Sequence, residues 1–377
     1  MNKKRFVAFV VLLGAVLVLG FTAQAAFAQQ LTAREQLGKN LFFDTDLSEP
    51  AGQGCVSCHH PDFGFAEPDQ FLPVSEGVIT GRFGTRNSPS AAYAVFFPEF
   101  TLKGGIQGGQ FWDGRAANLT EQAKGPFLNP VEMNNTSKAQ VIAKIAVSAY
   151  AAQFQQICGP DAFALANTEA AYHCMAASIA AFEGTSELNK FTSKFDFVQR
   201  GMGAFTSQEA LGQALFEGRG KCAHCHTSKV GGGLPVVFTD FKFHNIGVPK
   251  NSEFPFTLLP ANFVDLGLGG FLSDPRQNGR FKTTHIRNIE LTGPFMHNGV
   301  IKTLKQVVHF YNTRDVLPPC DPALGSLDPN FGTLCWPPPE LTQNMDSSFV
   351  GNLGLTDAEE NAIVAFMLTL TDGYMSP

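Results

Sequence analysis

Two cysteines followed by a histidine recur at the same spacing in two places of the 377-residue chain. The stretches are GCVSCHH at residues 54–60 and KCAHCH at residues 221–226. Cysteine pairs of this kind bind zinc, act as redox dithiols, form disulfides or attach haem covalently. The compartment, the neighbouring residues and the ligand on the far side of the metal decide between these uses.

The spacing favours covalently bound haem. In this use each cysteine adds to a vinyl group of the haem, and the histidine after the second cysteine reaches the iron from one face. Zinc requires four ligands, and neither motif has a further cysteine or histidine pair at suitable spacing. His60 and His224 are too close in the chain to reach the opposite face of the same haem. We therefore expect two haem c groups, bound by Cys55, Cys58 and His59 and by Cys222, Cys225 and His226.

The N-terminus has the layout of a secretory signal peptide over residues 1–28. Basic residues at 3–5 precede an apolar run, and Ala-Phe-Ala at 26–28 resembles a cleavage site. We expect an exported, periplasmic protein cleaved near Ala28. A retained membrane anchor is the alternative, although the apolar run at 6–21 is short for a span.

The remaining composition limits the partners and the number of domains. Loss of the leader leaves 24 basic and 33 acidic residues, a net charge of −9, which argues against nucleic acid as a partner. Roughly 350 residues are long for one domain and suit two. Export permits disulfides, and we interpret Cys158 with Cys174 and Cys320 with Cys335 as two local pairs, with buried thiols as the alternative.

An internal repeat places the two motifs on similar elements. EQLGKNLFFD from Glu35 and EALGQALFEG from Glu209 share E-x-L-G-x-x-L-F, which predicts a short amphipathic helix ahead of each motif. Further helical patterns close the halves near residues 173–188 and 355–372. The last one has Thr356 or Asp357 as its N-cap and glutamates in its first turn.

This order of elements predicts a mainly α fold of two class I cytochrome c-like domains, each with one haem c. We expect domains at residues 29–200 and 201–377, with the boundary near 195–206, where periodicity is lost. The stretches at 231–280 and 316–350, with many Gly, Pro and Phe residues, are expected to be ordered loops over the haems.

The stretch GGQFWDGRAANLTEQAKGPFLNPVEM at residues 108–133 resembles the di-haem bacterial cytochrome c peroxidase and MauG family. The resemblance covers nearly the whole mature chain and includes TRNSPS at 85–90, FHNIGVP at 243–249 and RNIELTGPFMHNG at 287–299. It implies a peroxide-reactive N-terminal haem and an electron-transferring C-terminal haem.

The resemblance also implies roles for individual residues. Trp112 matches the tryptophan that carries electrons between the haems, and Gln122, Pro126 and Glu132 match the distal side of the N-terminal haem. Heterolytic cleavage of peroxide moves a proton from one oxygen to the other, which a buried glutamate can do if its pKa approaches neutrality. A surface carboxylate in a loop is the alternative for Glu132.

A calcium site is implied by the resemblance alone. Asn87, Thr292 and Pro294 match the family's ligands to a calcium ion between the haems, the last two through backbone carbonyls. Oxygen ligands suit calcium. Without the resemblance, these residues would not point to a metal.

The far side of the N-terminal haem is expected to be open. Ordinary peroxidases of the family carry a second histidine there, whereas residues 61–132 contain neither histidine nor methionine. The N-terminal iron should therefore have His59 as its only protein ligand and an open face toward Gln122 and Glu132.

The far side of the C-terminal haem distinguishes the branches. Fourteen residues after His297, where the peroxidases have methionine, this chain has Tyr311, which is typical of the MauG-like branch. An anionic oxygen ligand stabilises higher iron oxidation states. His309 and Met296 are rival ligands, positions 309 and 311 of a helix face well apart, and Tyr311 could also be a core aromatic.

Three functions from two classes follow. The leading one is an oxidoreductase that reacts with hydrogen peroxide at the N-terminal haem and passes oxidising equivalents through Trp112 and the C-terminal haem to residues of a partner protein. The alternative is a cytochrome c peroxidase that reduces peroxide to water with electrons from a small cytochrome c or cupredoxin. A passive electron carrier is disfavoured by the open N-terminal site. Neither the partner nor the oligomeric state follows from the sequence.

Overall fold

The structure is a computed structural model that describes residues 30–228 and 235–375. The predicted signal peptide lies outside the described residues. None of the described helices combines the length and the apolar character needed to cross a membrane. The described helices and strands are α1 Ala33–Phe43, α2 Cys55–Cys58, α3 Leu119–Ala123, α4 Lys138–Ala146, α5 Ala151–Cys158, α6 Thr168–Glu183, α7 Lys194–Gln199, α8 Ser207–Glu217, β1 Phe243–His244, α9 Leu268–Leu272, β2 Phe281–Lys282, α10 Leu304–Thr313 and α11 Asp357–Leu368.

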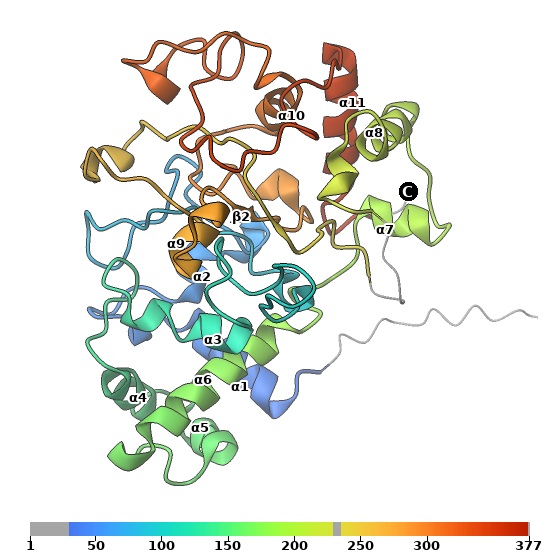
Figure 1. The fold of residues 1–377 in the computed structure, drawn as a ribbon. Helices are drawn as coiled ribbons and strands as arrows, with labels where there is room; N and C mark the ends of the chain where they lie inside the picture. Colours follow the sequence, from blue (N-terminus) through green and yellow to red (C-terminus); the bar gives the residue numbers. More distant parts are fainter. Residues whose placement is uncertain (1–29, 229–234, 376–377) are drawn as a thin grey trace, which may run out of the picture. The chain divides into compact units, whose positions relative to one another are not determined.

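The repeated helices each cross the helix that closes their half of the chain. Helix α1 packs on α6, and α8 packs on α11 (Figure 1). The glycine of the repeat lies at each crossing: a Cβ atom on Gly38 would be 1.8 Å from the carbonyl oxygen of Ser178, and one on Gly212 would be 1.9 Å from that of Ala362. The repeat is therefore a packing signal, because only glycine lets the two backbones approach so closely.

Replacing Gly212 by alanine is expected to lower the free energy of unfolding by about 1 to 3 kcal/mol, because the new Cβ atom forces the helices apart. The higher helix propensity of alanine, worth about 1 kcal/mol, opposes this effect without cancelling it. Urea unfolding of the haem-loaded protein measures the change. The neighbouring variant Leu211→Ala, at a side chain that is 50% exposed, should shift stability by no more than about 0.5 kcal/mol. Equal stability of the Gly212 variant and the parent would contradict this account of the crossing.

The bounds of one predicted closing helix differ from the prediction, and the start of the other is confirmed. Helix α6 begins at Thr168 and ends at Glu183, earlier than the predicted 173–188, because Gly184 and Thr185 already follow turn geometry. The start of α11 is confirmed: Thr356 is the N-cap and forms a capping box with Glu359.

The segment expected to lose periodicity at 195–206 instead begins inside a helix. Helix α7 forms because the Ser193 hydroxyl accepts a hydrogen bond from the backbone N–H of Asp196, whose carboxylate accepts one from the backbone N–H of Ser193. The division into domains at 29–200 and 201–377 stays a prediction.

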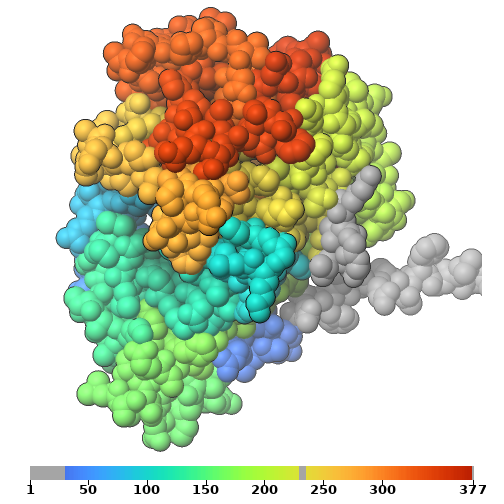
Figure 2. All heavy atoms as spheres, viewed as in Figure 1, coloured from blue at the N-terminus to red at the C-terminus, as the bar shows by residue number. Residues whose placement is uncertain are grey.

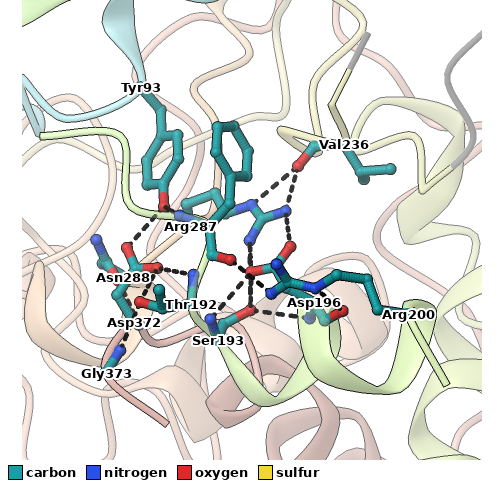
Figure 3. A network of polar contacts seen from close by, with 11 residues as sticks. Tyr93, Thr192, Ser193, Asp196, Arg200, Val236, Arg287, Asn288, Asp372 and Gly373 are labelled. Atoms are coloured by element: carbon teal, nitrogen blue, oxygen red, sulfur yellow. Dashed lines mark hydrogen bonds and ion pairs between the residues drawn. The ribbon is translucent and has the colours of Figure 1, made fainter. Parts of the chain in front are cut away.

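A polar network joins the α7 segment to distant parts of the chain (Figure 3). The buried guanidinium of Arg287 donates to both carboxylate oxygens of Asp196, at 2.6 and 2.8 Å, and to the carbonyl oxygen of Val236. Nearby, the Tyr93 hydroxyl donates to Asp372 at 2.7 Å. The network ties the first half of the chain to its C-terminal end.

Loops of the two halves also meet directly. Figure 2 shows the α9 segment, in orange, against the teal residues that precede α3. There the ring of Phe271 packs edge-on to that of Phe100, with 5.4 Å between the ring centres.

The two predicted disulfides are confirmed, with Cys158 bonded to Cys174 and Cys320 to Cys335.

Candidate functional site

A single cavity of about 790 Å³ collects the residues predicted to do chemistry. This volume lies in the upper part of the range for small-molecule sites. All fourteen predicted site residues line it: Cys55, Cys58, His59, Asn87, Trp112, Gln122, Pro126, Glu132, Cys222, Cys225, His226, Thr292, Pro294 and Tyr311. Residues separated by up to 256 positions in the chain thus face one space.

The two motif histidines are held in the same way. The Nδ1 atom of His59 lies 3.3 Å from the carbonyl oxygen of Phe65, and that of His226 lies 3.0 Å from the carbonyl oxygen of Phe238. A carbonyl can only accept, so Nδ1 carries the hydrogen and Nε2 keeps its lone pair. Burial lowers the pKa of both imidazoles, which keeps them neutral. This is the usual arrangement of a histidine that binds a metal through Nε2.

The motif cysteines are free thiols, unlike the other four cysteines of the chain. Burial raises the pKa of Cys58 and of Cys222 to about 12. Redox-active cysteines have a lowered pKa instead, because the thiolate is the reactive form. Unbonded thiol pairs beside oriented imidazoles, on one cavity, therefore fit covalent haem attachment better than dithiol chemistry.

The predicted distal residues come from α3 and the turn that follows it. Asn118 caps α3, which places Gln122 on the cavity; Pro126 begins a short 3-10 helix that ends at Leu128, and Glu132 lies in the turn after it. The Glu132 carboxylate accepts a hydrogen bond from the Asn129 amide at 2.8 Å. Burial raises the pKa of Glu132, while Asn129 and Arg115 oppose the shift. A cavity-facing carboxyl with a raised pKa is suited to proton transfer.

Trp112 lies on the cavity with its indole fixed. Its Nε1–H donates to the carbonyl oxygen of Asn87 at 2.8 Å, and the backbone N–H of Asn87 donates to the carbonyl oxygen of His297 at 2.7 Å. The indole also packs edge-on to the His297 ring, 6.4 Å between centres. The bond from Nε1 holds the ring in one orientation.

The three predicted calcium ligands, Asn87, Thr292 and Pro294, all line the cavity. The Asn87 amide nitrogen donates to the carbonyl oxygen of Pro73 at 3.1 Å, which leaves its side-chain oxygen available to a cation. Their part in calcium binding stays a prediction.

Helix α10 separates Tyr311 from its rival His309. Tyr311 lines the cavity, and burial raises its pKa, with smaller contributions from the nearby Cys225 and Cys222. His309 is not part of the cavity lining and instead contacts the Glu360 carboxylate through Nδ1 at 2.9 Å. Met296, the other rival, does line the cavity.

The cavity also has lining residues that the sequence reasoning missed: Met133, Glu183, Lys282 and His285. Met133 is the last residue of the matched stretch at 108–133, and Glu183 ends α6, where burial raises its pKa to about 8. Lys282 and His285 lie just before RNIELTGPFMHNG at 287–299. This closeness in sequence to a matched segment was the one signal that could have placed them at the site.

Comparisons with known proteins identify similar chains. The family model of the di-haem cytochrome c peroxidases matches residues 32–204. The methylamine utilization protein MauG of Paracoccus denitrificans is 38% identical over 90% of this chain and 89% of its own, and cytochrome c551 peroxidase of Nitrosomonas europaea is 32% identical over 72% and 71%. The crystal structure of the diheme peroxidase BthA from Burkholderia thailandensis is similar, with 33% identity, a TM-score of 0.79 and coverage of 92% and 88%.

Proposed function

Because the chain belongs to the di-haem cytochrome c peroxidase family and is an oxidoreductase that acts with hydrogen peroxide, we propose that it uses the oxidising equivalents of peroxide to oxidise residues of a partner protein, as the MauG-like branch does. The proposal includes two class I cytochrome c-like domains at residues 29–200 and 201–377, a calcium ion between the haems, and export to the periplasm.

The observation that carries this proposal is the placement of Tyr311. The phenol is on the cavity with the second haem motif, while His309 is held by Glu360 outside the cavity lining. A phenolate ligand stabilises higher oxidation states of haem iron, whereas a methionine ligand raises the reduction potential. Tyr311 at this position therefore favours storage of oxidising equivalents over electron uptake from a donor protein.

The proposed mechanism divides the work among residues of the cavity. A bound haem supplies the iron at which peroxide reacts. Glu132 takes a proton from one peroxide oxygen and returns it to the departing oxygen, while Gln122 donates a hydrogen bond and Pro126 keeps the space dry. Trp112 then carries electrons between the two halves of the site.

The runner-up is reduction of peroxide to water with electrons from a small cytochrome c or cupredoxin. The 32% identity to a cytochrome c551 peroxidase supports this alternative. The two functions differ in what reacts with the oxidised protein: a protein substrate in the first, a reduced donor in the second.

Changing Tyr311 to methionine tests the proposal. The variant should raise the potential of the C-terminal haem by a sizeable part of the roughly 0.8 V that axial ligands span. The fully oxidised parent should react with peroxide without prior reduction and hold both oxidising equivalents. The variant should also react, but it should not retain the second oxidising equivalent at the C-terminal haem. Electron paramagnetic resonance and optical spectra after one equivalent of peroxide measure both effects.

His309→Gln is the matched control on the same helix, and it should leave the C-terminal potential unchanged. Before peroxide, the oxidised parent should show one high-spin and one low-spin ferric haem. If it instead shows two low-spin haems and ignores peroxide until one electron is added, the chain acts as a reductively activated peroxidase and the proposal fails.

A further inference from the structure

Lys282, on β2, is a buried cation with no carboxylate in contact. Its side chain is 7% exposed and lines the cavity. The Nζ atom donates to the carbonyl oxygen of Gly109 at 3.0 Å and lies 4.3 Å from the centre of the Phe97 ring. Among the described residues, none forms an ion pair with it, and a backbone carbonyl only partly compensates a buried ammonium group.

The charges around Lys282 do not balance. Asp113, the acidic group that acts on its pKa, already forms ion pairs with both Arg86 and Arg115. Arg86 also holds Asp265 through two hydrogen bonds of 2.7 Å. Asp113 and Asp265 thus have their ion pairs with arginines, which leaves the ammonium of Lys282 without an ion-pair partner beside the cavity. Fully paired cations look different: Arg287 has both oxygens of Asp196 (Figure 3).

A second polar side chain near Lys282 has a nitrogen without a partner. The Nδ1 atom of His285 is buried and has no hydrogen-bond partner, although the residue lines the same cavity. Burial lowers the pKa of His285 to about 3, and the charge of Lys282 contributes to the shift, so the two groups lie close together and the imidazole is neutral. The buried ammonium requires an acceptor, and an anionic one, while the neutral imidazole adds a polar neighbour that carries no charge.

We propose that Lys282, with His285 beside it, binds a propionate carboxylate of a haem in this cavity. Haem carries two propionates, and their carboxylates are the anions that the family's cofactor brings into this space. The inference rests on the haem content and is independent of what the protein does with peroxide.

This assignment gives Lys282 a consequence for redox chemistry. Without an anion, burial lowers its pKa to about 7, against the opposing influence of Asp113. A carboxylate in contact keeps the lysine charged, and the lysine keeps the carboxylate ionised. The backbone N–H of Lys282 also donates to the carbonyl oxygen of Trp112 at 2.8 Å. The ion pair is therefore attached to the segment that connects the two halves of the site.

Three variants are compared with the parent. Lys282→Met removes the positive charge at similar side-chain volume, and Lys282→Arg keeps the charge. Lys242→Met is the control, because it removes an exposed lysine that directly precedes β1, the strand paired with β2. The midpoint potentials of both haems are titrated optically from pH 5 to 9, after mass spectrometry has confirmed two attached haems. Infrared difference spectra between reduced and oxidised protein are recorded with haem labelled by ¹³C at its propionate carboxyl carbons.

In Lys282→Met, one haem should shift to lower potential, and its potential should fall further as pH rises, because the propionate without its cation now titrates in this range. In the parent, in Lys282→Arg and in Lys242→Met, the midpoint potentials should not change over the same pH range. The labelled carboxylate band should move in Lys282→Met only.

An unchanged labelled band and unchanged potentials in Lys282→Met would overturn the proposal. Potentials that depend instead on added chloride or sulfate, with the band unmoved, would assign the site to a small inorganic anion and would also overturn it. If Lys282→Met does not fold, Lys282→Gln gives the same comparison. A protein that passes this test and yet fails to react with peroxide would refute only the proposed function.

Discussion

Glu132→Gln is expected to slow peroxide consumption by about 10² to 10⁴-fold, the range that a positioned acid-base group contributes. Glutamine keeps the hydrogen bond to Asn129 but neither accepts nor releases a proton at neutral pH. The haem-loaded parent and the variant are compared by stopped-flow absorbance with excess peroxide. Glu121→Gln, an exposed glutamate of α3 next to Gln122, is the matched control and should react at the parent rate.

The same carboxyl sets an expected pH dependence. Burial raises the pKa of Glu132, so the parent rate should rise with pH through a value above the ordinary range of a glutamate, and the variant should lose this limb. Folding stability should change in the opposite direction to the rate. Because the folded state holds the proton of Glu132 more tightly than the unfolded state does, the free energy of unfolding falls as pH rises from the unfolded-state pKa to the folded-state pKa. Glu132→Gln should therefore not unfold more easily at neutral pH. A parent rate that is flat across this range would remove Glu132 as the proton carrier.

Trp112→Phe is expected to leave the reaction with peroxide intact while slowing electron transfer between the haems at least about tenfold, which corresponds to only about 1.4 kcal/mol in the barrier. The aromatic body remains, but the easily oxidised indole and its hydrogen bond to the Asn87 carbonyl are lost. Double-mixing experiments separate the two steps, because peroxide consumption and the second haem's oxidation give different optical changes.

The second tryptophan of the chain supplies the control. Trp336 is 2% exposed, its Nε1–H donates to Thr313, and it is not part of the cavity lining. Trp336→Phe makes the same chemical change away from the site and should transfer electrons at the parent rate. Equal rates in Trp112→Phe and Trp336→Phe would show that electrons take another route.

The sequence predicts those parts of the site that local chemistry encodes. Cys-x-x-Cys-His fixes which side chains attach the haem, and the repeated glycines at 38 and 212 mark the helix crossings, because each signal lies within a few residues. Trp112 and Glu132 could be placed on one site only through the family resemblance. Tyr311 and His309 were separable in advance, since helical geometry sends them in different directions.

Other features depend on the tertiary structure and leave no local pattern. Lys282 lies in a two-residue strand, and only the burial of the finished fold shows that its charge has no counterpart. In the sequence, Glu183 is an ordinary residue at the C-terminal end of a helix, and only the tertiary structure shows that it lines the cavity. The helix over Lys194–Gln199 was missed because the glycines that follow it obscured a capping box only four residues long.

The division of the eight cysteines has a consequence for biogenesis. Each disulfide joins residues only 16 or 15 positions apart, so both can close early, as soon as a short stretch of chain is available. The four motif cysteines are closer still within their pairs, and any oxidant able to close the disulfides also threatens them. Thioether formation needs the free thiols, so the motif pairs must be reduced when haem is attached. A recombinant host that leaves these pairs oxidised would yield colourless protein.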